Sequence, residues 1–435
     1  MATTDLTRTH TVATADERKK HTFSAWIKLS STGSVSNTFF ANRPSGNYRF
    51  YYMLQNSTAS GANQFYCYMV YNGSAMLEAT GTRKLRDVNG WYHIVVRTDT
   101  TQGTGADRFR FYVNGEQDTL SFGHTPDQDE ELQVNRDTTH YIGEEGNGNG
   151  QFDGSMSHIH FCDGYSYAPT EFGETDATTG EWKGKTSPSV TYGNNGFFIL
   201  KDGNGITDQS GEGNDFTLGG GTLTDLKDNP DNVFATLNPN HQSTFHSTSR
   251  ATLANGNTKW TGSSNNTGQN GILSTLGAST GKFYLEAKWK GTYDCILGVA
   301  KDDFGMMTAG SGGFQSAGWY GMMTNISNTG GSGMQWWSNN SATGDRGNTI
   351  STNDIIMMAI DIDNNKLYFG KNGTWEESGD PTSGASGTGA TSTLASNTTY
   401  LVGCANYGYD VANSWEFNFG NGYFGTTAVS SAGTN

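Results

Sequence analysis

Apolar and polar residues alternate over many short segments of this chain. The segment TFSAWIKL at 22–29 places an apolar residue at every second position, and so does KFYLEAKW at 282–289. Because successive side chains of a strand point to opposite faces, each segment presents one apolar face to a core. Similar segments fill the chain between clusters of Gly, Asn and Thr, and little of it has a helical pattern. We therefore predict an all-β protein built from sandwiches or barrels.

Two hairpins with nearly the same sequence lie about 260 residues apart. They are RFRFYVNGEQ at 108–117 and NKLYFGKNGTW at 365–375, and another apolar strand precedes each, at 90–100 and 354–365. Asn-Gly tolerates the positive φ that a tight hairpin turn requires. The repeated unit of strand, connection, strand and Asn-Gly predicts two sandwiches of related architecture.

The spacing of the strands predicts three parts. A first sandwich or barrel covers 1–170, a connector covers 171–243, and a second sandwich covers 244–435. The connector holds the apolar run GFFIL at 196–200, whose side chains need a partner surface, so we expect it to be structured and to pack on the sandwiches. Each sandwich is expected to fold around its own core.

Composition and charge exclude several classes of function. Charged residues make up 16% of the chain and Gly numbers 59 in 435 residues, which suits a loop-rich β protein. A net charge of −15 argues against a nucleic-acid groove. No apolar run approaches the roughly 18 residues of a membrane span, and the N-terminus lacks the apolar core of a signal peptide. We expect no nucleic acid, no membrane insertion, and synthesis in a reducing cytoplasm with all four cysteines unpaired: Cys67, Cys162, Cys295 and Cys404.

Candidate catalytic residues are few. Glycoside hydrolases of such folds need two carboxylates on one strand face, yet Glu286 and Glu416 each stand alone on a strand. Asp361 and Asp363 have a suitable spacing but fall where a hairpin turns. The pair in SHIHF, His158 and His160, lies two apart on one strand face without a third metal ligand. We expect the protein not to be an enzyme.

Aromatic and amide side chains offer a site for sugars. In GMQWWSNN at 333–340, Trp336 and Trp337 are adjacent, so one should face the core and the other the surface or a covering loop. Aromatic faces stack on sugar rings, and amides bond hydroxyls. We predict a glycan site on loops of the second sandwich, formed by Trp319, Tyr320, Trp336, Trp337 and Asn339. The alternative is one core tryptophan and one under a loop.

One loop is rich in oxygen donors. The segment KDGNGITDQSGEGND at 201–215 contains Asp202, Asn204, Asp208 and Asp215. Calcium accepts six to eight oxygen ligands in flexible geometry, so these residues are a candidate calcium site, although the spacing is not that of an EF-hand. The alternative is that the carboxylates bond the backbone in turns. No other cofactor is predicted.

Three sets of motifs resemble known families. HTFSAWIKL, RFRFYVNGEQ, YIGEEG and FDGSMSHIHFCDG resemble the laminin-G-like branch of the concanavalin-A-like jelly rolls. GKFYLEAKW, CILGVAKDD, GWYGM and SWEFNFGNG are similar to SPRY domains. The connector motifs YGNNGFFILKD, DQSGEGNDFT and DNPDNVFATLNP resemble segments that join such domains in virion proteins of tailed, often marine, bacteriophages.

The resemblance implies a phage virion structural protein of tail-fibre or appendage type, with lectin-like domains that adhere to host-surface glycans. The alternatives are capsid decoration or another purely architectural role, and a stand-alone carbohydrate-binding protein. The implied partners are other virion proteins and further copies of the chain, three if it forms a fibre. The implied place is the exterior of a particle assembled in the host cytoplasm. Laminin-G-like domains of this type usually have a further leading strand, whereas the first strong strand here starts about twenty residues in, so we expect a short edge or a borrowed strand.

Overall fold

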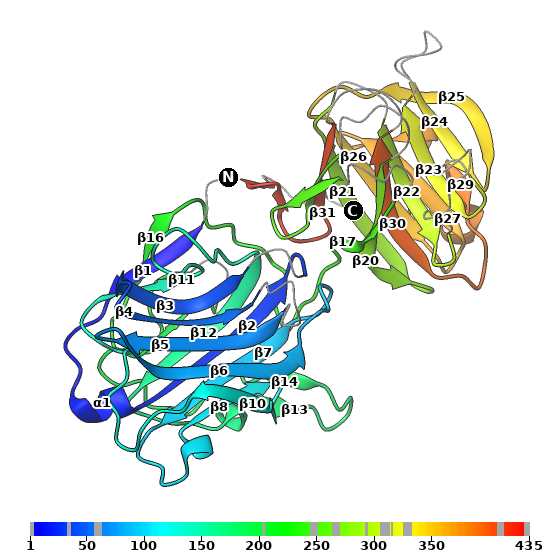
Figure 1. Cartoon of the computed structure of the whole chain (residues 1–435). Helices are drawn as coiled ribbons and strands as arrows, with labels where there is room; N and C mark the ends of the chain where they lie inside the picture. The colour runs from blue at the N-terminus through cyan, green and yellow to red at the C-terminus, as the bar shows by residue number, and fades with distance from the viewer. Residues whose placement is uncertain are drawn as a thin grey trace. The chain divides into compact units, whose positions relative to one another are not determined.

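The alternating segments form strands in the computed structural model, and the chain divides into two units, residues 1–233 and 234–435 (Figure 1). Each unit contains two large sheets, which confirms the predicted fold class of two tandem β-sandwiches. Within the ranges described, no helix is long and apolar enough to cross a membrane. The structure describes residues 4–32, 36–55, 63–201, 205–243, 251–262, 270–291, 295–304, 314, 316–324, 333–406 and 413–429.

The first unit pairs an eight-stranded sheet with a six-stranded one. In spatial order the larger sheet holds β10 (Leu120–His124), β6 (Ser74–Lys84), β5 (Gln64–Tyr71), β4 (Tyr48–Leu54), β3 (Asn37–Ser45), β11 (Thr139–Ile142), β1 (Asp5–Thr9) and β16 (Thr217–Gly220). The smaller holds β15 (Phe197–Ile199), β12 (Gly154–Asp163), β2 (Lys20–Leu29), β7 (Tyr92–Asp99), β8 (Phe109–Val113) and β9 (Glu116–Gln117). Short elements complete the unit: α1 (Ala15–Lys19), η1 (Gly105–Asp107), η2 (Pro169–Glu171), β13 (Gly173–Thr175) and β14 (Trp182–Gly184).

The apolar faces predicted from the alternation meet between these two sheets. Phe23 of β2, Phe40 of β3 and Phe161 of β12 are all buried, and the ring centroid of Phe40 lies 5.2 Å from that of Phe23 and 5.3 Å from that of Phe161. The other face of β2 is buried as well, because residues that follow β12 cover it; Trp26 on that face is 5% exposed. The six-stranded sheet is therefore covered on both faces at this strand.

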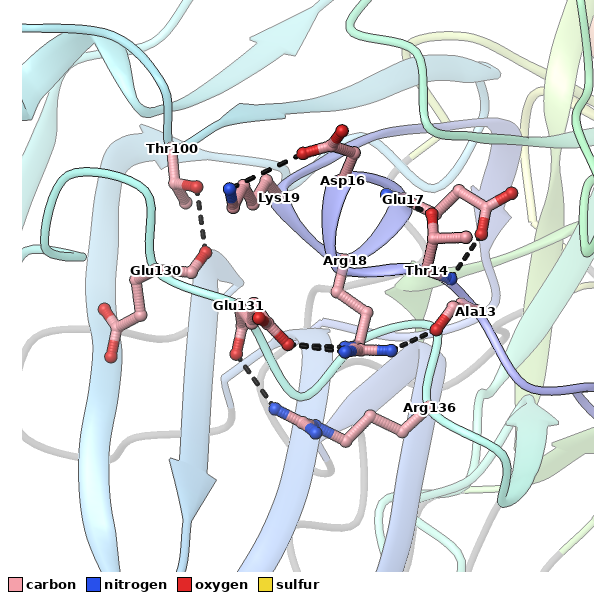
Figure 2. A network of polar contacts seen from close by, with 10 residues as sticks. All are labelled: Ala13, Thr14, Asp16, Glu17, Arg18, Lys19, Thr100, Glu130, Glu131 and Arg136. Carbon is pink, nitrogen blue, oxygen red and sulfur yellow. Dashed lines mark hydrogen bonds and ion pairs between the residues drawn. The ribbon is translucent and has the colours of Figure 1, made fainter.

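A polar network ties α1 to the loop before β11 (Figure 2). The Thr14 hydroxyl accepts from the Glu17 backbone and the Glu17 carboxylate accepts from the Thr14 backbone, which is a capping box. Arg18 donates to the Glu131 carboxylate from two nitrogens, and Arg136 donates to the Glu131 carbonyl at 3.0 Å. A five-residue helix with no buried residue is too short to be stable alone. These bonds therefore hold it.

Most of the predicted connector belongs to the first sandwich. β15 pairs with β12 and β16 pairs with β1, so that each adds a strand at the edge of one sheet. These strands satisfy backbone groups that the edges would otherwise expose. The division after residue 233 therefore replaces the predicted boundaries at 170/171 and 243/244.

The leading strand that we expected to be absent is present. Residues Asp5–Thr9 pair with β11, and Leu6 is 2% exposed. This strand has a single apolar residue, so alternation did not reveal it. β16, from the same chain, takes the outer edge.

The second unit is a seven-stranded sheet packed on an eight-stranded one. The first sheet holds, in order, β17 (Leu237–Gln242), β20 (Gly271–Ala278), β30 (Tyr400–Asn406), β22 (Cys295–Lys301), β23 (Trp319–Thr324), β24 (Gly333–Ser338) and β25 (Ser341–Thr349). The second holds β18 (Thr252–Ala254), β19 (Lys259–Thr261), β31 (Ser414–Asn418), β21 (Lys282–Trp289), β26 (Ile355–Asp361), β27 (Lys366–Lys371) and β28 (Thr374–Trp375), with β29 (Ser392–Thr393) also paired to β27. Among the described residues of this unit, the other elements are η4 (Glu376–Ser378), η5 (Gly384–Ser386), β32 (Tyr423–Phe424) and β33 (Thr427–Ala428).

Aromatic rows fill the second core. Trp260, Trp415 and Trp289 stand opposite one another on adjacent strands, and all three are fully buried. Cys67 and Cys162 in the first unit and Cys404 in the second are buried. The side chain of Cys295 lies outside the described set.

The two Asn-Gly hairpins have the same local geometry. Asn114 and Asn372 both adopt φ of 49°, and the glycine after each has a φ of 80° or more. Each Asn side chain accepts a hydrogen bond at 2.8 Å from the backbone of the preceding strand, at His93 and Ile355 respectively. The repeated sequence thus encodes both the turn and a bond that closes the end of the neighbouring strand.

Candidate functional site

One row of side chains crosses five strands on the outer face of the eight-stranded sheet. Backbone register places Tyr141 of β11, Ala41 of β3, Tyr51 of β4, Tyr68 of β5 and Glu78 of β6 opposite one another in turn. With strands about 4.8 Å apart, the row is roughly 20 Å long. The neighbours of Tyr51 in the sequence point inward to the core, so the alternation of YRFYYML forces Tyr51 outward.

A fourth tyrosine extends the row into a surface. Tyr66 lies two residues before Tyr68 on the same strand face, and its ring centroid is 6.2 Å from that of Tyr68 and 6.0 Å from that of Tyr51. The centroids of Tyr51 and Tyr68 are 5.9 Å apart. All four tyrosines are partly exposed. We call Tyr51, Tyr66, Tyr68 and Tyr141 the tyrosine face.

Charged groups stand beside these rings. The Tyr66 hydroxyl donates to the Glu78 carboxylate at 3.0 Å, and the guanidinium of Arg49 lies 5.3 Å from the ring centroid of Tyr68. Arg43 forms an ion pair with Glu145 at 2.9 Å. Hydrogen-bonding groups of both signs thus border an aromatic surface.

The phenols of Tyr51 and Tyr66 stay protonated at neutral pH. Burial raises the pKa of Tyr51 to about 12, with a further contribution from the Glu145 carboxylate. Burial also raises the pKa of Tyr66, together with its hydrogen bond to Glu78. The rings can therefore contact apolar CH groups of a ligand while hydroxyls, carboxylates and guanidinium groups bond its polar atoms.

The residues predicted for a glycan site in the second sandwich have different surroundings. Trp319, Tyr320 and Trp336 are 1%, 4% and 2% exposed, so their rings cannot meet a ligand in this state. Trp337 is partly exposed, and Asn339 is exposed in the hairpin after β24, where its side chain accepts from the backbone of Gly318. A glycan site in the second sandwich remains a prediction. Of the five residues predicted for it, only Trp337 and Asn339 are exposed enough to contact a ligand.

Trp319 has a structural reason to be buried. A Cβ added to Gly298 or Gly321 would come within 3 Å of its indole ring, and one at Gly403 within 3.1 Å. These glycines stand opposite one another on β23, β22 and β30. The ring lies against backbone that only glycine leaves bare, and the ring of Phe314 packs against it with centroids 4.7 Å apart.

The oxygen-rich loop uses its described carboxylates for its own backbone. The Asp208 carboxylate accepts from the backbone of Phe198, Ser210 and Asn214, and the Asp215 carboxylate accepts from the backbone of Asp208. Asp202 and Asn204 lie outside the described residues. Within the described ranges, no three His, Cys, Asp or Glu side chains are grouped to hold a metal ion. The described part matches the alternative of turn chemistry, and calcium remains a prediction.

The structure brings together two carboxylates that looked isolated in the sequence. Glu286 and Glu416 lie on adjacent strands and on one face, since Glu416 is opposite Lys288. Diagonal neighbours of this kind are about 7–8 Å apart. Glu286 accepts from Tyr284 and Asn418, and Glu416 forms an ion pair with Lys259. Both carboxylates thus have bonding partners within the sheet.

Two further sequence assignments can be compared with the geometry. Asp361 accepts from the backbone and side chain of Asn364, which is the expected turn chemistry. His158 and His160 do not share a regular strand face, because His158 has a φ of 49° and the pairing of β12 with β2 shifts register there. A bulge of this kind reorients one side chain.

Comparison with known proteins concerns mainly the first sandwich. Residues 2–168 match the family model of the concanavalin A-like lectin/glucanases superfamily. That match covers a fold that serves both binding proteins and hydrolases. No curated protein matches the chain in sequence.

Among solved structures, similar ones include the SPRY domain of human HERC1, at 14% identity and a TM-score of 0.27, and the PSpry domain of TRIM65, at 12% and 0.28. Each similarity covers 42% of this chain, with 96% of the first structure and 91% of the second. At these scores, neither structure says anything about what this chain binds.

Proposed function

We propose that the protein binds carbohydrates through the tyrosine face and that it is not an enzyme. The observation that carries this proposal is the group of partly exposed tyrosines, in which Tyr51 and Tyr68 pair on adjacent strands, bordered by Glu78 and by the Arg43–Glu145 pair. Sugar rings combine apolar CH faces with hydroxyls, and this surface offers partners for both. The match of residues 2–168 to a lectin-containing superfamily supports the same class of ligand.

Several features support binding without catalysis. The nearest candidate for an acid and base pair, Glu286 and Glu416, lies in the other sandwich and is bonded to Tyr284, Asn418 and Lys259. Hydrolysis by two carboxylates requires one of them to be an acid and both to reach the sugar. We therefore expect no hydrolysis of any glycan that the protein binds.

At a finer level, we propose a structural protein on the exterior of a phage virion, of the tail-fibre or appendage type, that adheres to the host surface as a homo-oligomer. This assignment rests on the sequence resemblance of the connector to virion proteins. Repeated copies on a particle favour symmetric oligomers. The copy number per purified particle, and the mass of the free protein in solution, test this part independently of glycan binding.

The binding proposal is tested with the full-length protein on a panel of glycans. Replacing Tyr51 and Tyr68 together by Ala should lower affinity roughly 5- to 150-fold, because two stacking contacts of about 0.5–1.5 kcal/mol each are lost. Tyr165→Ala removes an exposed tyrosine elsewhere in the same sandwich and should leave affinity unchanged. Trp337→Ala tests the predicted second site in the same assay.

Two results would decide against the tyrosine face. One is a wild-type protein that binds no glycan in the panel. The other is a double variant that keeps its fold, by circular dichroism, and its affinity. Loss of binding with Trp337→Ala alone would instead place the site on the second sandwich.

A further inference from the structure

A segment of the first sandwich covers the outer face of the six-stranded sheet. Residues 164–196, which we call the cover segment, include the small hairpin of β13 and β14. Thr22 of β2 donates to the carbonyl of Tyr165 and accepts from the backbone of Tyr167, and Arg97 of β7 donates to the Ser166 hydroxyl. The cover segment thus lies across β2 and β7, on the face of these strands that is opposite to the core.

His93 is the contact point for the hairpin. The indole N–H of Trp182 donates to Nδ1 of His93 at 3.0 Å, and Nε2 of His93 lies 2.8 Å from the Ser24 hydroxyl. The rings of Trp26 and Trp182 both lie beside the His93 ring, at centroid distances of 5.0 Å and 5.9 Å. Since an indole N–H can only donate, Nδ1 must accept and therefore carries no proton.

A second histidine lies under the same segment. His160 of β12 is 3% exposed and packs against Phe172 and Tyr192 of the cover segment, with its Nδ1 2.9 Å from the Tyr192 hydroxyl. His93 is 1% exposed. Two buried imidazoles therefore contact the underside of one surface segment.

We propose that the hairpin 173–184 of the cover segment is an acid-released lid, closed at neutral pH because neutral His93 accepts the hydrogen bond of Trp182. Protonation of His93 puts a hydrogen on Nδ1, so the bond to Trp182 is lost and a buried cation is created. Opening relieves both effects, because an exposed imidazolium is hydrated. The hairpin 173–184 is the part that His93 holds directly.

Burial and the neighbouring basic groups all lower the pKa values of the two histidines. Burial, with a smaller contribution from the nearby His158, lowers the pKa of His93 to about 3. Burial lowers the pKa of His160 well below its usual range, with His158, His93 and Lys201 adding to the effect. Ser24, Trp26, Trp182 and Asn114, which contact His93 from the other elements, carry no charge.

The remaining charges lie outside these contacts. Within the hairpin, Lys183 pairs with Glu174 and Asp176. Asp163, whose pKa burial raises to about 7, accepts from the backbone of Asn195 at the far end of the segment and favours closure there at lower pH. The release should therefore be confined to the hairpin.

The sign of the pH dependence follows from these directions. A histidine with a lowered folded pKa binds fewer protons in the closed state than in the open one, so closure is fully stable above about pH 6.5 and weakens below it. The opening constant should rise about tenfold per pH unit below 6.5 for each histidine that becomes exposed.

Hydrogen exchange of the full-length protein, corrected for the intrinsic rate at each pH, tests the lid. Between pH 7.5 and 4.5 the wild-type hairpin should lose protection, while β2 and β12 stay protected. His93→Asn keeps an acceptor for Trp182 that does not titrate. In this variant the opening constant of the hairpin should therefore lose the rise of about tenfold per pH unit that His93 contributes. His124→Asn, at an exposed histidine, should behave as the wild type.

A second variant covers the case in which His93→Asn does not fold. Trp182→Phe removes the donor and should open the hairpin already at pH 7.5. A hairpin equally protected at both pH values would overturn the lid, as would loss of protection in the hairpin and β2 together at one pH. The lid would also be overturned if His93→Asn showed the same pH dependence of hairpin exchange as the wild type, or if Trp182→Phe left the hairpin as protected as in the wild type at pH 7.5.

Discussion

Two adjacent tryptophans of β24 differ in their surroundings, although the sequence gives them equal chemistry. Trp336 is 2% exposed and stacks on Phe369 with centroids 5.5 Å apart, whereas Trp337 is partly exposed on the opposite face of the strand. Trp336→Ala should lower the free energy of unfolding by about 3–5 kcal/mol because it leaves a cavity in the core. Trp337→Ala, as the matched control, should cost clearly less. Denaturant unfolding of both variants measures this, and equal losses would contradict the assignment of Trp336 to the core.

At the scale of elements, the hairpin from β26 to β27 depends on its turn residue in two separable ways. Asn372 adopts a positive φ, and its side chain bonds the backbone of Ile355 and the carboxylate of Asp354. Asn372→Gly keeps the φ and loses the bonds, so it should destabilise the protein by about 1 kcal/mol. Asn372→Ala loses the bonds and also strains the backbone at this positive φ, so it should lower the free energy of unfolding by about 1–2 kcal/mol more than Asn372→Gly. Chemical denaturation of the two variants compares these terms, and equal stability of Ala and Gly variants would show that backbone strain is negligible there.

At the scale of the whole molecule, the division into two units sets where the chain can be cut. β17 pairs with β20 of the second sandwich, and it begins at Leu237, before the boundary predicted from the sequence. A fragment of residues 234–435 should be soluble and rich in β-structure by circular dichroism. One that starts at 244 lacks β17, exposes the edge of β20 and should aggregate or melt at a lower temperature. Equal melting temperatures for the two fragments would show that β17 is dispensable.

The tyrosine face shows why a site can escape sequence reasoning. The motifs YRFYYML and QFYCYMVY indicate strands, and their alternation puts Tyr51, Tyr66 and Tyr68 on one face of each strand. The local sequence, however, does not indicate that Tyr51 pairs with Tyr68, or that Tyr141 lies beyond Ala41 in the same row. The burial of Trp319 could not be predicted from the sequence for a related reason. Three glycines that are distant in sequence form the backbone surface against which its ring packs.

The local pattern of residues was enough to predict most of the long strands, the two Asn-Gly hairpins and the two sandwiches, because the two-residue period of a strand and the positive φ of a turn are local properties. The folded structure was needed to show that β1, β15 and β16 complete the first sandwich, that Glu286 and Glu416 share a face, and that His93 bonds Trp182. Each of these depends on which strand pairs with which and in what register. Pairing is set by the burial of whole faces and the closing of sheet edges, and a local pattern of apolar and polar residues carries no information about its distant partner.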